Sequence, residues 1–159
     1  MAHIEIIPGT LAQVHQIIDG LREADRIELS LMGGDPAEKI VQGWNMSNYR
    51  RIFTADGEPI VVSGVVPSLF DDGDGVPWMV ATDAITNVSR KFLKASASEI
   101  ERMRMGYGEL RNATHKDNTV SIQWLQWLGF RIGTEPVGPG GALRMFSMPG
   151  LPGEGMSHV

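Results

Sequence analysis

The sequence of 159 residues contains no cysteine, which excludes a disulfide framework, a thiolate metal site and a cysteine nucleophile. Long apolar runs are also missing, because none approaches the roughly 18 residues that a membrane-spanning helix needs. The N-terminal segment MAHIEIIPGT lacks the basic and apolar regions of a signal peptide. These absences predict a soluble protein that stays in the compartment where it is made.

Positive charge is scarce as well, with 14 Lys and Arg against 19 Asp and Glu and a net charge of −5. That balance argues against bulk binding of nucleic acid. The acidic run Asp71–Gly75 lacks the spacing and the late Glu of a calcium loop, and is interpreted as a surface turn. We predict no metal site, since the histidines are scattered without the close spacing of ligands: His3, His15, His115 and His158.

The apolar content of 42% is enough to build the core of one domain, and the chain is too short for two of full size. We expect a single domain over residues 1–148. Residues 149–159, PGLPGEGMSHV, carry almost no core-forming side chain after Leu151. They are predicted to form a flexible Gly/Pro-rich tail, which either frays or becomes ordered against a partner.

The first half of the chain predicts a strand, two helices and a hairpin. The strand covers residues 3–7, and Thr10 then caps a helix with apolar residues at helical spacing. A second helix begins with Asp35 as N-cap and Pro36 at its first position, and runs toward Trp44. Asp56-Gly57 is a two-residue turn signal between two β-rich runs.

The second half starts with a strand at PWMVATDAI, residues 77–85. Residues 89–107 are predicted to form either one kinked helix or two consecutive helices, because Ser98 and Glu101 have the spacing of a capping box. A strand follows at residues 109–115. Asn118 caps a last helix, which Gly129 ends before two final strands. The order predicts an α/β (α+β) fold with one mixed, mostly antiparallel central sheet flanked by helices.

The segment DNTVSIQWLQWLGFRI resembles the C-terminal signature of the GNAT superfamily of acetyl-CoA-dependent N-acetyltransferases. In that signature an Asn opens a helix that ends eleven residues later in Gly-Phe. Asn118, Gly129 and Phe130 hold these positions. The order of elements along the whole chain matches as well, so the resemblance implies a GNAT-like fold.

Within the superfamily, residues 24–148 resemble a GNAT-like group encoded by tailed phages, to which internal virion protein A of short-tailed phages is similar. The resemblance is carried by Ala24-Asp25 with Glu28, the Asp56-Gly57 hairpin, PWMVATDAI and the step from Leu110 to Asn112. It implies a virion-associated or assembly protein of the host cytoplasm and the phage virion. Its partners would be other phage structural proteins, contacted through the C-terminal tail.

Active GNAT proteins bind the pyrophosphate of acetyl-CoA with a glycine-containing loop after the central strand, where backbone amides point at the anion. This chain has no glycine from Thr82 through Met105. If acetyl-CoA is bound, the resemblance implies a cofactor site made of the following residues: Val80, Thr82, Ser89, Arg90, Lys91 and Asn118. An ordinary basic helix start explains residues 89–91 equally well.

The family pattern also places a proton-donating Tyr seven residues after the Asn, where this chain has Leu125, which cannot donate a proton. The base that accepts the proton of the attacking amine has four candidates: Glu28, Glu38, Asp83 and His115. Their positions alone support them. His115 is also explained as a solvated turn residue, and Asp83 as the cap of the turn that follows the strand.

Two functions are compatible with these features. The first is a phage virion-associated or assembly protein with a GNAT-like fold that lacks efficient acetyl-CoA catalysis and needs no cofactor. The alternative is an active acetyl-CoA-dependent N-acetyltransferase acting on an amine of a small molecule or protein. Under the first, the wedge beyond Ala81 that holds the acyl donor in active members should be partly formed or filled by bulky side chains: Trp78, Met79, Trp124 and Trp127.

Overall fold

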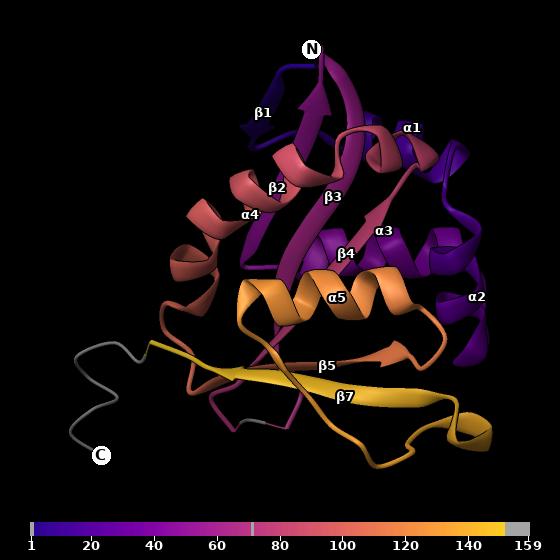
Figure 1. The fold of residues 1–159 in the computed structure, drawn as a ribbon, viewed down its shortest axis with the longest axis vertical. Coiled ribbons are helices and arrows are strands. Elements are labelled where there is room, and N and C mark those ends of the chain that lie inside the picture. Colours follow the sequence, from indigo (N-terminus) through magenta and orange to yellow (C-terminus); the bar gives the residue numbers. More distant parts are fainter. Residues whose placement is uncertain (1, 71, 152–159) are drawn as a thin grey trace.

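The computed structural model describes residues 2–70 and 72–151, and shows an α+β fold built on one seven-stranded sheet. The strand order is β1-β2-β3-β4-β5-β7-β6. Helices α1, α2 and α3 cover one face, and α4 and α5 cover the other (Figure 1). The strands are β1 (Ile4–Ile7), β2 (Tyr49–Ala55), β3 (Glu58–Pro67), β4 (Gly75–Ala81), β5 (Glu109–His115), β6 (Arg131–Ile132) and β7 (Leu143–Pro149). The helices are α1 (Leu11–Asp19), α2 (Glu23–Leu31), α3 (Pro36–Met46), α4 (Ser89–Arg104) and α5 (Thr119–Leu128).

Side-chain caps fix the starts of α1 and α5, whereas α3 begins at Pro36 as predicted but without a side-chain capping bond from Asp35. Thr10 Oγ1 accepts a hydrogen bond from the Gln13 amide at 3.3 Å, and Gln13 Oε1 accepts one from the Thr10 amide at 3.0 Å, which makes a reciprocal capping box for α1. Asn118 Oδ1 accepts from the Ser121 amide at 3.3 Å, so α5 begins where the sequence predicts. Gly129 ends α5 with a φ of 106°, a conformation that favours glycine.

Three details differ from the sequence-based expectation. Helix α4 is one helix, and Ser98 Oγ donates to the Ala95 carbonyl at 2.6 Å within it, so the capping box with Glu101 does not form. Strand β4 stops at Ala81, and residues Asp83–Asn87 form a 3-10 turn. Helix α2 adds a third helix before the first hairpin. Its N-cap residue, Arg22, makes no side-chain capping bond, which explains the weak start signal.

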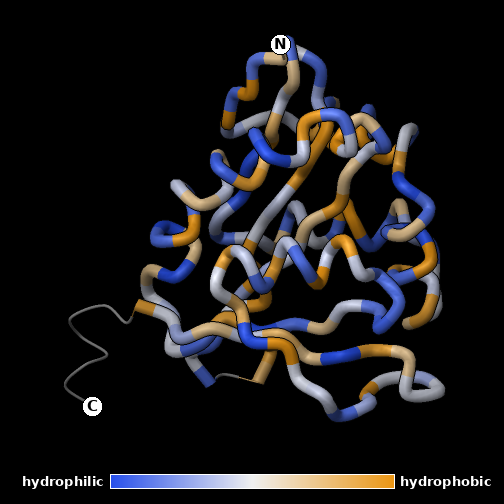
Figure 2. The backbone as a smooth tube through the Cα atoms, viewed as in Figure 1, coloured by the Kyte–Doolittle hydropathy of each residue, from blue (hydrophilic) through white to orange (hydrophobic). Residues whose placement is uncertain are grey.

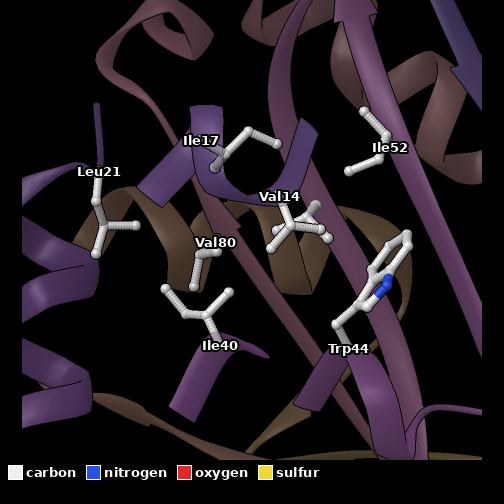
Figure 3. Packing of buried hydrophobic residues seen from close by; sticks show 8 residues of the cluster. Val14, Ile17, Leu21, Ile40, Trp44, Ile52 and Val80 are labelled. Carbon is white, nitrogen blue, oxygen red and sulfur yellow. The ribbon is translucent and has the colours of Figure 1, made fainter. Parts of the chain in front are cut away.

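A hydrophobic core lies on each face of the sheet. The first core packs α1 and α3 against β2, β3 and β4, with most members almost fully buried (Figure 3): Val14, Ile17, Leu21, Ile40, Trp44, Ile52, Val62 and Val80. The second core joins α4 and α5 to the opposite face, where Phe92 lies 5.3 Å from Phe53 and 5.6 Å from Trp124 between ring centres. Hydrophilic and hydrophobic residues alternate along the helices accordingly (Figure 2).

The sheet divides between β4 and β5. These parallel strands pair only at Gly75 and Leu110, whereas β4 pairs with β3, and β5 with β7, over seven antiparallel residue pairs each. A Cβ on Gly75 would lie 2.8 Å from Val65 and 2.9 Å from Leu110, so the closest approach requires glycine. Beyond this point β5 turns away from β4 (Figure 1). We call the resulting gap the wedge; it opens after Gly75 instead of after Ala81.

The C-terminal strand is followed by two residues that remain bound to the domain. The Gly150 amide donates to the Gly108 carbonyl at 2.9 Å, and the Leu151 amide donates to the Arg104 carbonyl at 2.8 Å. The rest of the expected tail, residues 152–159, lies outside the described residues. Among the helices that are described, none combines the length and the apolar character needed to cross a membrane.

Candidate active site in the wedge

The wedge contains a cavity of about 590 Å³ that is lined from both helical layers. Glu28, Met32 and Met46 line it on the side of α2 and α3, and Ser96 and Leu128 line it on the side of α4 and α5. A continuous sheet would separate these layers, so the divergence of β4 from β5 connects them. The volume falls within the range of roughly 300–1,000 Å³ that is typical of small-molecule sites.

The bulky side chains that were expected to fill the wedge instead line it or lie outside it. Trp78 and Met79 are partly exposed on β4, and Trp124 lies in the wall formed by α5. Trp127 has 56% of its surface exposed and is not part of the cavity wall. Of the partly formed or filled wedge that the sequence predicts, the filled alternative is wrong, because a cavity of about 590 Å³ remains among the residues that line it.

The open edge of β4 presents three consecutive wedge-facing peptide groups. The Thr82 amide donates to Ile60 of β3 at 2.9 Å, so by alternation the groups of Pro77, Met79 and Ala81 point the other way, into the wedge. The Pro77 carbonyl accepts a hydrogen bond from Asn112 Nδ2 at 2.8 Å. The Met79 group lies between Pro77 and Ala81 and faces the cavity that Met79 lines.

The last of these groups, at Ala81, is bound by the start of α2. The Ala81 carbonyl accepts from the Arg22 amide at 2.9 Å, and the Ala81 amide donates to Asp25 Oδ2 at 2.9 Å. The Arg22 guanidinium also donates to both Asp25 oxygens, at 2.9 and 2.8 Å, and lies 5.4 Å from the centre of the Trp124 ring on α5. Arg22 and Asp25 are only 7% and 3% exposed. We call the side chains of Arg22, Asp25 and Trp124 the clasp, since they join α2 to α5 at the open end of the wedge.

The opposite edge, on β5, is bound by two polar side chains. Asn112 Oδ1 accepts from the Ala113 amide at 2.8 Å. Glu28 Oε1 accepts from Thr114 Oγ1 at 2.7 Å and from the His115 amide at 2.5 Å. Among the described residues, no side chain or amide donates to Glu28 Oε2 and no cation pairs with this carboxylate. Glu28 is thus held rigidly in the wall of the cavity with one oxygen available.

The α4 wall carries two buried polar groups. Ser96 is 7% exposed, and its Oγ has no hydrogen-bond partner among the described residues. Glu99 accepts from the Tyr49 hydroxyl at 2.8 Å and lies 3.3 Å from Arg51 and 3.7 Å from Arg102. Burial, together with the hydrogen bond to Glu99, raises the pKa of Tyr49 far above its ordinary value of 10.0, so this hydroxyl stays protonated.

The structure separates the four candidate bases. Glu28 lines the cavity, whereas Glu38 is exposed on α3 and Asp83 is exposed in the 3-10 turn after β4. His115 Nδ1 accepts from the Asp117 amide at 3.1 Å, so its ring is held in the turn that follows β5. His115 contributes its backbone amide to the position of Glu28 instead. Asp25 and Asn112 carry part of the resemblance seen in the sequence, but no local pattern indicates that they bind the strand edges, because these contacts join distant parts of the chain.

The candidate cofactor residues also fall in different places. Val80 lines the cavity, and the Thr82 amide is bound to β3. Asn118 caps α5, with its Nδ2 buried and unpartnered among the described residues. The basic segment lines a second, smaller hollow with Ala2 and Asn87 at the start of α4, where Lys91 donates to the Ala2 carbonyl: Ser89, Arg90 and Lys91.

The predicted acidic turn pairs with an arginine at the surface. The acidic turn places Asp72 and Asp74 near Arg111, at 3.5 and 3.6 Å. A hydrogen bond from the Asp74 amide lowers the pKa of Asp72. Across residues 2–70 and 72–151, no cluster of three or more His, Asp or Glu side chains has the arrangement of a metal site.

No family model matches the sequence, and no curated protein resembles it closely enough to count as a relative. Solved structures do match over nearly the whole chain. The ribosomal-protein-S18-alanine N-acetyltransferase from Escherichia coli is 13% identical, with 97% of each chain covered and a TM-score of 0.61. A GCN5-related N-acetyltransferase from Kribbella flavida is 16% identical, with 92% of this chain and 97% of that chain covered and a TM-score of 0.63.

A third structure, yncA from Salmonella typhimurium with its cofactor acetyl-CoA, is 13% identical, with a TM-score of 0.60 and coverage of 92% of this chain and 93% of that one. At such low identity the likeness establishes the fold alone. The fold predicted from the sequence is therefore confirmed: the chain is a GNAT-fold protein whose structural neighbours include acetyltransferases.

Proposed function

We propose that the protein is an acetyl-CoA-dependent N-acetyltransferase that acts on an amine. The observation that carries the proposal is the cavity that passes through the sheet between β4 and β5 and reaches both helical layers. To transfer an acetyl group, the enzyme has to bring the thioester and the amine into contact at one point. The remaining parts of the two substrates have to occupy separate space. A site open to two faces of a sheet meets that requirement.

Glu28 is the residue best placed to accept the proton of the acceptor amine. As the amine nitrogen bonds to the acyl carbon and the carbon–sulfur bond breaks, the nitrogen has to lose a proton, which a positioned carboxylate can take. Thr114 and the His115 amide fix Oε1, and within the described part of the chain no donor faces Oε2. The Met79 amide is the peptide donor that the clasp and Asn112 leave for an acyl oxygen.

The cavity residues fit the acyl-bearing pantetheine part of acetyl-CoA better than the residues at the start of α4 fit its phosphates. The cavity supplies room, and the unpartnered Ser96 hydroxyl supplies a buried hydrogen-bonding group in its α4 wall. When bound, acetyl-CoA supplies an activated acyl group as a thioester. For the phosphates the chain offers the first amides of α4, which have no side-chain cap, together with Ser89, Arg90 and Lys91.

The test is a thermal-shift titration with acetyl-CoA, using two serines of α4 as a matched pair. Ser96 points into the cavity wall, whereas Ser98 is exposed on the same helix. At about 100 times its Kd, acetyl-CoA should add roughly 2.7 kcal/mol of stability, which raises the Tm of a domain this size by about 5–10 °C. Ser96→Leu should reduce the shift by occupying part of the cavity at its α4 wall, and Ser98→Leu should retain it.

Equal shifts in both variants would place the ligand elsewhere, and no shift in the wild-type protein would overturn the proposal. Ser121→Leu narrows the cavity from α5 and gives a second, independent obstruction if Ser96→Leu lowers the Tm of the free protein too far. Transfer is then followed by the release of free thiol from acetyl-CoA in the presence of an amine.

A second candidate is a non-catalytic scaffold in a phage particle. It is supported by Leu125 at the position of the proton donor and by the absence of glycine between Thr82 and Met105. The clasp adds to this support, because Arg22 and Asp25 already occupy both hydrogen-bonding groups of Ala81. Recovery of the protein from purified particles, combined with no acetyl-CoA shift, would favour this candidate over the enzyme.

A further inference from the structure

Three exposed apolar side chains, which we call the rim, line the cavity. Met32 follows α2, Met46 ends α3 and Leu69 lies in the loop between β3 and β4, and all three line the cavity. They are 67%, 40% and 82% exposed, respectively. Single exposed apolar residues are ordinary, but three that line the same cavity indicate a candidate binding surface.

The cavity is also lined by the aromatic side chain of Trp78, which is held in place by its neighbours. Trp78 Nε1 donates to Ser47 Oγ at 2.8 Å. Its ring lies close enough to Gly64 that a Cβ there would be 2.7 Å from Nε1, and a Cβ on Gly43 would be 3.4 Å from the ring. The indole is therefore held in one orientation while part of it lines the cavity.

The charged side chains that line the cavity leave one negative charge without a cationic partner among the described residues. Arg22 and Asp25 neutralise each other in the clasp, and Lys39 Nζ donates to the Leu29 carbonyl at 2.7 Å. Glu28 is the carboxylate in the wall that no cation pairs with among the described residues. A ligand with one positive charge would find a partner at Glu28. A second positive charge would meet the apolar rim, Lys39, or Asp72 and Asp74, which already lie 3.5 and 3.6 Å from Arg111.

From these observations we infer that the acceptor is a monoamine with an apolar or aromatic body, bound with its amine toward Glu28 and its body on Trp78 and the Met32, Met46 and Leu69 rim. This inference rests on the proposed function and specifies its substrate class. A polyamine would carry charge onto apolar side chains, which is costly without pairing. An amino sugar would leave its hydroxyls without partners on the same surface.

The experiment compares phenethylamine, spermidine and glucosamine as acceptors for acetyl-CoA, with thiol release as the signal. We expect kcat/KM for phenethylamine to exceed the other two by at least about tenfold, since apolar contacts of this size discriminate by roughly 10–200-fold. The double variant Met32→Ser/Leu69→Ser should raise the KM for phenethylamine about five- to tenfold. Both side chains are exposed, so their replacement leaves the core intact.

The control variant is Trp127→Ser, which removes an exposed apolar side chain on α5 outside the cavity wall and should leave the KM unchanged. Binding of phenethylamine, measured by calorimetry without turnover, should weaken in the rim variant and not in the control. Preference for spermidine or glucosamine, or equal effects of the two variants, would overturn the inference while acetyl-CoA binding still stood. Absence of any acetyl-CoA shift would overturn the proposed function and the inference with it.

Discussion

Replacing Asp25 with Ala is predicted to destabilise the fold strongly, because it breaks the clasp at its most buried member. The carboxylate is 3% exposed and accepts three hydrogen bonds, from Arg22 Nε, Arg22 Nη2 and the Ala81 amide. All three donors lose their acceptor in Asp25→Ala. Arg22, itself 7% exposed, keeps its positive charge without an anion beside it.

The expected loss follows from these contacts. Removing one partner of a buried ion pair costs roughly 3–5 kcal/mol, most of it from the charge left behind. Here the Trp124 ring, 5.4 Å from the guanidinium, retains part of the stabilisation through a cation–π contact. The adjacent cavity also allows water to reach Arg22. We therefore expect a decrease of about 3 kcal/mol in the free energy of unfolding, a large share of the roughly 5–15 kcal/mol typical of a domain.

Urea denaturation measures this decrease as a lower midpoint at constant slope. Arg22→Met/Asp25→Leu removes both charges and should recover part of the loss, leaving a cost of about 1–2 kcal/mol for the unpaired Ala81 amide. Glu23→Ala is the control: its side chain, 76% exposed, lies 3.8 Å from Arg26 on the same helix, and it should cost less than about 1 kcal/mol. A loss below about 1 kcal/mol in Asp25→Ala, or no recovery in the double variant, would refute the reasoning.

Two further predictions concern Glu28 and Tyr49. Glu28→Gln keeps an oxygen for Thr114 and the His115 amide, so acetyl-CoA binding should persist while kcat/KM falls about 10²–10⁴-fold; a loss under threefold would assign the base elsewhere. Tyr49→Phe removes the 2.8 Å bond to Glu99 and should cost about 1.5–3 kcal/mol at neutral pH, measured in urea. Because the pKa of Tyr49 is raised above its ordinary 10.0, this contribution is fully present below pH 10.0 and is lost as the pH rises above it. The two proteins should then converge in stability at alkaline pH, and a constant difference would contradict the assignment.

The fold could be predicted from the sequence because its signals are local. Thr10, Asn118 and Gly129 set helix ends through contacts within a few residues, and the structure places them as expected. Helix α2 begins without a side-chain cap, so no local pattern announces it. Ser98 and Glu101 show the opposite case: the spacing of a capping box occurs inside α4, where the surrounding helix already satisfies the backbone.

The site could be predicted only in part, because it depends on contacts between distant residues. Glu28 meets the amide of His115 across 87 positions, and Asp25 meets the Ala81 amide across 56. Sequence reasoning identified Glu28 among four candidate bases, but nothing near Asp25 indicates that it binds the edge of a strand. The opening of the wedge at Gly75 was equally hidden, since a buried glycine between Val65 and Leu110 carries no turn signal.

The same polar side chains explain how the sheet can remain open. Two central strands that diverge expose peptide groups, and each buried group without a partner costs free energy. Asp25 binds the edge of β4, Glu28 binds the edge of β5, and Asn112 binds one group on each. These side chains replace the missing ladder of backbone bonds and leave the space between the strands free. The residues that keep the wedge open are thus also those that surround its candidate chemistry, so stability and activity should respond together to Asp25→Ala and separately to Glu28→Gln, which preserves the edge bonds.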